Sequence, residues 1–69
     1  MIAGARNQLT GTVVEIKRGT VMCSVKVKIT DKINMSSVMT LDSLDELGVK
    51  KGDTVMLAVK AVNVLLFKE

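Results

Sequence analysis

VMCSVKVKIT, residues 21–30, is the stretch that decides the fold. Apolar side chains occupy every second position in it, namely Val21, Cys23, Val25, Val27 and Ile29. A period of two, carried largely by β-branched side chains, is typical of a strand that buries one face. We therefore predict a half-buried β-strand over residues 21–30.

The segments on either side predict further short strands separated by turns. Residues 8–17 are also rich in β-branched side chains, and Arg18-Gly19 supplies a hairpin turn before the central stretch. Asp31-Lys32 marks a second turn. A third strand is predicted over residues 33–39, with alternate side chains on one face: Ile33, Met35, Ser37 and Met39.

The spacing of the apolar residues changes after the third predicted strand. Leucines recur every third residue, and a glycine follows them at the place where helices stop: Leu41, Leu44, Leu47 and Gly48. Thr40 or Asp42 can serve as the N-cap. The pattern predicts one short helix of about two turns.

A turn over residues 50–53 leads to two more predicted strands, over residues 54–60 and 62–67. Five short strands with one small helix between the third and fourth are typical of an all-β, OB-like barrel. An SH3-like barrel is the nearest alternative. We expect a single domain over residues 1–69.

The composition predicts self-association. The chain has 69 residues, of which 48% are hydrophobic, and it has five glycines besides. Hydrophobic residues and glycines together exceed the roughly 45–50% that the same residue types make up in ordinary soluble domains. A domain of this size cannot bury so much apolar surface alone, so we expect homo-oligomers whose interfaces complete the core.

Cysteine usage and hydropathy bear on the compartment. Cys23 is the only cysteine, so an internal disulfide is impossible. The sequence shows neither a charged leader with an apolar run nor a stretch approaching 18 apolar residues, which predicts a cytoplasmic protein that does not span a membrane. The net charge of +3 favours anionic partners.

Catalytic sites of the common kinds are excluded by residue type. The chain has no histidine, so His/Cys zinc sites, Ser/His/Asp sets and Cys/His pairs cannot form. The carboxylates of the predicted helix, Asp42, Asp45 and Glu46, fit a solvated helix face. The sequence has no phosphate-binding loop with a lysine after its last glycine. We predict a protein that is not an enzyme.

Anion binding is the chemistry that remains. Polar groups lie where the chain changes direction: Arg6-Asn7, Thr40 with Ser43, and Lys60. Hydroxyl and backbone N–H groups can surround a tetrahedral dianion while one lysine or arginine offsets its charge. The same residues can equally be a helix cap, an exposed helix residue and surface charges, and spacing alone leaves both interpretations open.

Five blocks of the sequence, in order, resemble one family. They are ARNQLTGTV (5–13), KRGTV (17–21), MTLDS (39–43), LGVKKGD (47–53) and VKA (59–61). Together they resemble the molbindins, small Mop-type molybdate-binding proteins. The resemblance implies a TOBE-type OB-like fold, assembly as a hexamer (a trimer of dimers), and molybdate or tungstate held at subunit interfaces, without an organic cofactor or a protein-ligated metal ion.

The resemblance also assigns oxyanion-binding roles to particular residues. It implies backbone donors from Ala5 and Arg6, hydroxyls from Thr40 and Ser43, and a charge and a backbone contact from Lys60 and Ala61. A second site is assigned to the Gly19–Val21 hairpin. Gly4 replaces a serine that many members carry, which removes one hydroxyl donor from the first site.

The resemblance implies intracellular storage or homeostasis of molybdate or tungstate, and two other functions stay open. An OB-type nucleic-acid-binding module is one, but such modules stack bases on aromatic side chains, and this chain has only Phe67. A purely structural oligomerisation module is the other. We expect no nucleic-acid partner and no membrane partner.

Overall fold

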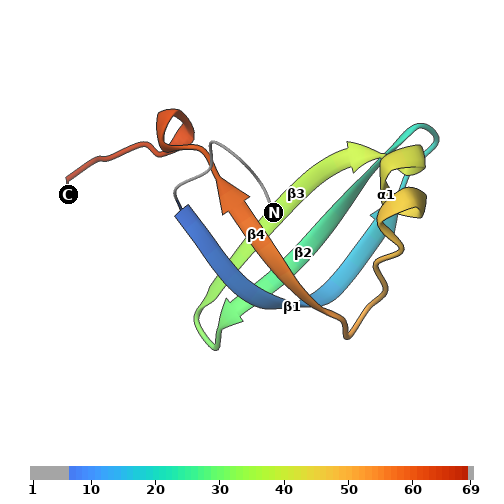
Figure 1. The fold of residues 1–69 in the computed structure, drawn as a ribbon, viewed down its shortest axis with the longest axis horizontal. Helices are drawn as coiled ribbons and strands as arrows, with labels where there is room; N and C mark the ends of the chain where they lie inside the picture. The colour runs from blue at the N-terminus through green and yellow to red at the C-terminus, as the bar shows by residue number, and fades with distance from the viewer. Residues whose placement is uncertain (1–6, 69) are drawn as a thin grey trace.

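The computed structural model describes residues 7–68, which form one curled antiparallel sheet with a short helix at one end (Figure 1). The strands are β1 (Asn7–Arg18), β2 (Met22–Thr30), β3 (Ile33–Thr40) and β4 (Thr54–Val59). The helix α1 (Leu41–Leu47) joins β3 to β4, and a 3-10 turn, η1 (Ala61–Asn63), follows β4. The order in the sheet is β3-β2-β1-β4. The predicted mostly-β fold, with its helix between the third and fourth strands, is confirmed.

The core lies on the inner face of β2. Its fully buried side chains are Val13, Cys23, Val25, Val27 and Leu44. The predicted alternation in β2 is thus confirmed from Cys23 to Val27. It is wrong for Val21, which is 65% exposed and lies in the hairpin turn, before the strand begins.

β1 bends so that it belongs to two pairings. Its first half pairs with β4 and its second half with β2, with a bulge between Val13 and Glu15. An extra residue at a bulge bends a strand and increases its twist. Gly11 lies in the crowded part of this bend: a Cβ there would be 2.6 Å from Cγ1 of Val27 and 2.8 Å from the backbone oxygen of Lys28.

The helix begins and ends where its capping residues predict. Thr40, rather than Asp42, is the N-cap, and its hydroxyl accepts a hydrogen bond from the N–H of Ser43. Gly48 ends the helix with φ of 70°, and its N–H donates to the carbonyl of Leu44 at 3.0 Å. Glycine adopts this left-handed conformation without the steric cost that a Cβ imposes. Leu44, 2% exposed, anchors the helix against the sheet.

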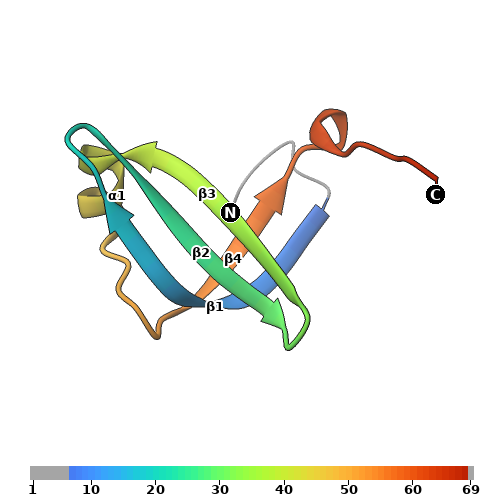
Figure 2. The ribbon, with the colours of Figure 1, turned by 180° about the vertical axis from the view of Figure 1, so that it is seen from behind.

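The predicted fifth strand is not formed by the described residues, so the expectation of five strands in one chain is corrected to four. β4 ends at Val59, and the next residues form η1, in which the N–H of Asn63 donates to the carbonyl of Lys60 at 2.9 Å. We call residues 62–67 the C-terminal segment. Figures 1 and 2 show it leading away from the sheet. A strand needs a neighbouring edge for its hydrogen bonds, and this course gives the segment none in its own chain.

Candidate functional site

One group of the predicted site residues lies at the junction of β3 and α1. The Ser43 N–H donates to Oγ1 of Thr40 at 3.1 Å, and the Thr40 hydroxyl donates to Oγ of Ser43 at 2.9 Å. Each hydroxyl has a single hydrogen to donate. In this arrangement the hydrogen of Thr40 is already used, whereas that of Ser43 remains to be donated outward.

The β1–β2 hairpin meets this junction. Met22 pairs with Thr40 across the β2–β3 ladder, and the Leu41 N–H donates to the carbonyl of Val21 at 2.9 Å. A hollow of about 280 Å³ results, lined by Thr20, Val21, Thr40, Leu41 and Asp42. The hairpin assigned to a second site therefore lies beside the Thr40 group and shares one hollow with it.

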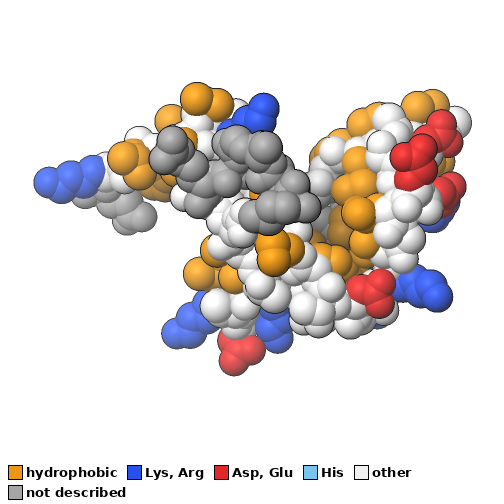
Figure 3. Space-filling view, viewed as in Figure 1, with side chains coloured by type: hydrophobic (Ala, Val, Ile, Leu, Met, Phe, Trp, Pro, Cys, Tyr) orange, Lys and Arg blue, Asp and Glu red, His pale blue; other side chains and the backbone are white. Residues whose placement is uncertain are grey.

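The charge around this hollow is negative rather than positive. Asp42 lines the hollow, and Figure 3 shows acidic side chains gathered at the α1 end. Asp45 is paired with the guanidinium of Arg18 at 3.0 Å. The helix has only seven residues, and the N–H groups of Leu41 and Ser43 already have acceptors. A dianion bound here therefore needs positive charge from elsewhere.

The predicted positive charge lies at the opposite end of the sheet. Lys60 follows β4 and precedes η1, exposed and without a side-chain capping hydrogen bond, and Ala61 is the first residue of η1. Asn7, the first described residue, pairs with Val59 beside it. Figures 1 and 2 place η1 and α1 at opposite ends of the molecule.

β1 runs between these two groups along a bent path, so its contour length is an upper limit on their separation. Arg18, at one end of β1, pairs with Cys23 next to the Thr40 group, and Asn7, at the other end, lies beside Lys60. Twelve residues of strand span a contour of about 36 Å. Within one chain, the structure brings Thr40 together with Ser43, but it does not bring either hydroxyl to Lys60.

Three of the residues discussed above lie outside the described part of the chain. These are Gly4, Ala5 and Arg6. Their expected contribution to the first site, and the effect of the glycine that replaces serine, stay predictions.

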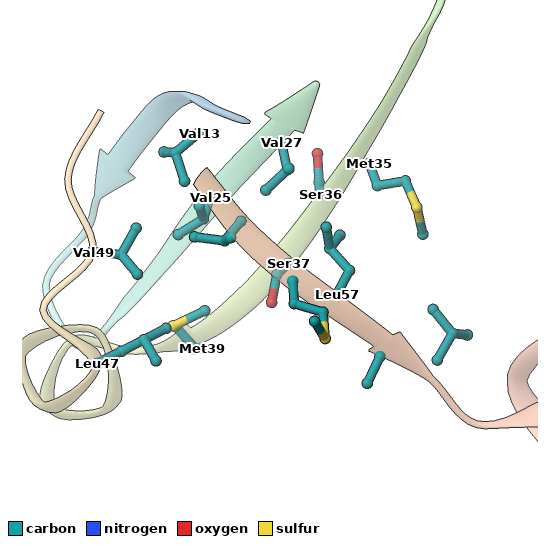
Figure 4. A pocket seen from close by; sticks show the side chains of 14 residues that line it. Val13, Val25, Val27, Met35, Ser36, Ser37, Met39, Leu47, Val49 and Leu57 are labelled. Carbon is teal, nitrogen blue, oxygen red and sulfur yellow. The ribbon is translucent and has the colours of Figure 1, made fainter. Parts of the chain in front are cut away.

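Sequence reasoning missed a second hollow, on the inner face of the sheet. It has a volume of about 300 Å³ and lies between β3 and β4, as Figure 4 shows. Apolar side chains such as Val25, Val27, Met35, Met39 and Leu57 line it. Two of its walls, β3 and β4, do not pair with each other, so only the curl of the sheet reveals it.

Residues 7–68 contain no group of three or more His, Cys, Asp or Glu side chains placed to hold a metal ion. None of the helices in that range has the length and hydropathy needed to cross a bilayer. Cys23 is a buried free thiol.

Comparison with known families decides the relationship. The TOBE domain model matches residues 4–66, almost the whole chain. The chain belongs to the TOBE domain family. This TOBE domain is 41% identical to molybdenum-pterin-binding protein 2 of Clostridium pasteurianum over 66 residues, which cover 96% of this chain and 97% of the relative.

Solved structures agree with this relationship. A molybdate-binding protein from Sporomusa ovata matches with a TM-score of 0.89 and 34% identity, over 99% of this chain and 100% of the other. The cytoplasmic molybdate-binding protein ModG, solved with molybdate bound, matches with a TM-score of 0.85 and 35% identity, over 94% of this TOBE domain and 46% of ModG. The predicted resemblance to the Mop-type proteins is confirmed. These relatives are named for binding, which confirms that the domain is a binding module rather than an enzyme.

Proposed function

We propose that this TOBE domain binds molybdate or tungstate at the contact between copies of the chain. The observation that carries the proposal is the split of the donors: the hydroxyls belong to the start of α1 and the lysine precedes η1, at the other end of the chain, in a domain whose relatives bind molybdate. The Thr40 and Ser43 hydroxyls of one copy, together with Lys60 and Ala61 of another, make the donor set.

The chemistry of these groups suits a tetrahedral dianion. The Ser43 hydroxyl accepts from Thr40 and can donate its own hydrogen to an oxyanion, and such chains of hydrogen bonds strengthen one another. Lys60 has three N–H donors and a full charge. Together they supply neutral donors and partial charge compensation. In this proposal the backbone donors of Ala5 and Arg6 complete the first site, and the hairpin at Gly19–Val21 contributes to a second.

We also propose how the chain assembles and what it does in the cell. The chain forms one domain over residues 1–69, which assembles as a hexamer, a trimer of dimers, stores molybdate or tungstate in the cytoplasm, and needs no organic cofactor. Exposed apolar side chains at both ends of the sheet, among them Val21, Leu47 and Val62, support self-association.

A mixing experiment tests whether the site spans two copies. One variant is Lys60→Ala, and the other carries Thr40→Val with Ser43→Ala. Each alone is expected to bind molybdate much more weakly, but after joint refolding some sites combine intact hydroxyls of one chain with Lys60 of another. Calorimetric titration of the mixture should then recover a fraction of the wild-type molybdate sites. A mixture that binds no better than either variant would show that the two groups do not share an intermolecular site.

A molybdenum–pterin ligand is the second candidate, because a relative's name refers to one. Pterin rings stack on aromatic side chains, and this chain has one phenylalanine and neither tyrosine nor tryptophan. We therefore favour the bare oxyanion. Elemental analysis and a near-ultraviolet spectrum of the purified protein distinguish the two ligands. Molybdenum without pterin absorbance indicates the bare oxyanion, and molybdenum with pterin absorbance indicates the pterin ligand.

Nucleic acid is a weaker candidate ligand, again because the chain has so few aromatic side chains. Lys26 and Lys28 on the outer face of the sheet already pair with Glu15 at 3.6 Å and Asp31 at 3.3 Å. With no aromatic side chains beside them, these lysines offer no base-stacking surface. A purely structural module would purify without stoichiometric molybdenum or tungsten.

Ser43→Ala is expected to weaken molybdate binding by about threefold to tenfold, since one neutral hydrogen bond contributes about 0.5–1.5 kcal/mol. Ser36→Ala, at an exposed position on β3, is the matched control. Calorimetric titration measures both. Equal affinities for the two variants would remove Ser43 from the site.

Asp42→Asn is expected to strengthen molybdate binding. Its carboxylate lines the hollow and repels a dianion, and at a surface site this repulsion corresponds to about threefold to tenfold in affinity at low salt. Glu46→Gln, in the last turn of the same helix, is the control. The gain should shrink as sodium chloride is added; a gain of the same size at high salt would contradict the electrostatic explanation.

A further inference from the structure

One ion pair joins the β1–β2 hairpin to α1. The guanidinium of Arg18, the last residue of β1, lies 3.0 Å from a carboxylate oxygen of Asp45 on the helix. The two residues are 27 positions apart in the chain, and Figures 1 and 2 both show the hairpin beside α1. No other ion pair among residues 7–68 involves this helix. The pair therefore links the two elements that line the hollow at Thr40.

A backbone hydrogen bond attaches the hairpin to the helix at a second point. The Leu41 N–H donates to the carbonyl of Val21 at 2.9 Å. Leu41 and Asp45 are four residues apart on α1, so they lie on the same face of the helix, about 6 Å apart along its axis. Arg18 ends β1 and Val21 immediately precedes β2, so the two links hold both sides of the hairpin turn. One link alone would let the helix pivot against the hairpin, whereas two links one turn apart fix its direction.

Packing adds little to these two links. The seven residues of α1 include one fully buried side chain, Leu44, and Leu47 in the last turn is 62% exposed. The hairpin turn is exposed from Gly19 to Val21. Since a single buried contact leaves a short helix free to turn about that contact, the ion pair supplies a constraint that the core does not.

The ion pair also changes the charge beside the hollow. α1 carries three carboxylates, Asp42, Asp45 and Glu46, and has no basic residue in its last turn. Arg18 compensates one of them. Its side chain is 53% exposed and that of Asp45 is 63% exposed, and exposed pairs contribute little to the free energy of unfolding. We therefore expect this pair to affect the local position of the hairpin rather than the stability of the whole domain.

We propose that Arg18 and Asp45 are positioning residues for oxyanion binding. Their ion pair holds the hairpin on α1 and so fixes the hairpin relative to the hydroxyls of Thr40 and Ser43. This inference rests on the proposed function, in which those hydroxyls bind molybdate and the hairpin contributes to a second site. Neither the guanidinium nor the carboxylate needs to touch the anion, because each acts through the element that it holds in place.

Asp45→Asn separates positioning from charge. The substitution removes a negative charge from the α1 end, so charge alone would strengthen the binding of a dianion. Because it also breaks the ion pair, we expect molybdate affinity in calorimetric titration to fall about threefold instead. Glu46→Gln makes the same charge change in a residue that forms none of the ion pairs among residues 7–68, and it should not lower the affinity. An Asp45→Asn protein that binds molybdate as tightly as the wild type, or more tightly, would overturn the inference.

Exchanging the two charges tests the pair itself. Arg18→Asp alone places two carboxylates against each other and should lower the affinity more than Asp45→Asn does. Arg18→Asp combined with Asp45→Arg restores an ion pair at the net charge of the wild type, and it should return the affinity to within about twofold of the wild-type value. A double variant that binds no better than Arg18→Asp would show that the pair does not position the site.

Hydrogen exchange tests the link without molybdate. The Leu41 amide should exchange about threefold faster in Asp45→Asn than in the wild type, while the melting temperature stays the same. Equal exchange rates at Leu41 would overturn the inference, and so would a fall in mass in solution that accounts for the lost affinity. A wild-type protein that binds no molybdate would refute the proposed function and this inference with it. Wild-type binding that the substitutions leave unchanged would refute this inference alone.

Discussion

Lys60→Ala is expected to lower molybdate affinity by about tenfold to a hundredfold while leaving the oligomer intact. A hydrogen bond to a charged group contributes about 1.5–3 kcal/mol, more than a neutral one. At this site the charge matters further, because Asp42 places negative charge beside the hydroxyl half. Lys60 lies exposed after β4 and caps nothing with its side chain, so its removal should not disturb the fold.

Lys68→Ala makes the same charge change eight positions further along the chain, in a residue that the site does not use. Lys60→Arg keeps the charge with a different geometry and should retain part of the affinity. Calorimetric titration with molybdate, with light scattering on the same samples, measures both affinity and assembly. Equal affinities for Lys60→Ala and Lys68→Ala would show that Lys60 acts only as part of the net charge.

Gly11→Ala is expected to destabilise the fold by about 1–3 kcal/mol, although the same exchange at an open site commonly stabilises. Its Cβ would meet side chains of Val27 and Ile29 and the backbone oxygen of Lys28, all within 3 Å. The backbone oxygen belongs to the β2 ladder and cannot move alone. The bend of β1 would therefore have to open.

Thermal unfolding at one fixed protein concentration measures this effect, because the stability of an oligomer depends on concentration. A loss of this size lowers the melting temperature by several degrees or more in so small a domain. Thr10→Ala, at the exposed neighbouring position, should change it little. An unchanged melting temperature for Gly11→Ala would contradict the close approach of β1 and β2.

Much of the fold could be predicted from local patterns. The alternation in β2 and the caps Thr40 and Gly48 are signals carried by neighbouring residues, and the structure has the strand and the helix where they indicate. The turn after the helix is also local: the carboxylate of Asp53 accepts from the N–H of Lys50 at 2.9 Å.

The sequence could not decide whether residues 62–67 form a fifth strand, and the reason is physical. The C-terminal segment has an apolar composition suited to a strand, but a strand exists only where another edge pairs with it. Sequence periodicity does not tell which edge, or which copy of the chain, supplies that partner. In the single chain the segment has no edge beside it and stays exposed.

The candidate site also combines features set by neighbouring residues with features set by the tertiary arrangement. Thr40 and Ser43 are three residues apart at a helix start, so their contact was predictable from spacing alone. The meeting of the Gly19–Val21 hairpin with Thr40 depends on the β2–β3 register, and the separation of Lys60 depends on the course of β1. Neither can be read from local sequence, because both come from tertiary arrangement.

The most direct test of the central claim is a calorimetric titration of the metal-free wild-type protein with molybdate, with its mass in solution measured in parallel. Sulfate and phosphate serve as competing tetrahedral anions. We expect saturable binding at micromolar molybdate by an oligomer, weakly affected by either competitor. An assembled protein that takes up neither molybdate nor tungstate at micromolar concentrations would contradict the account.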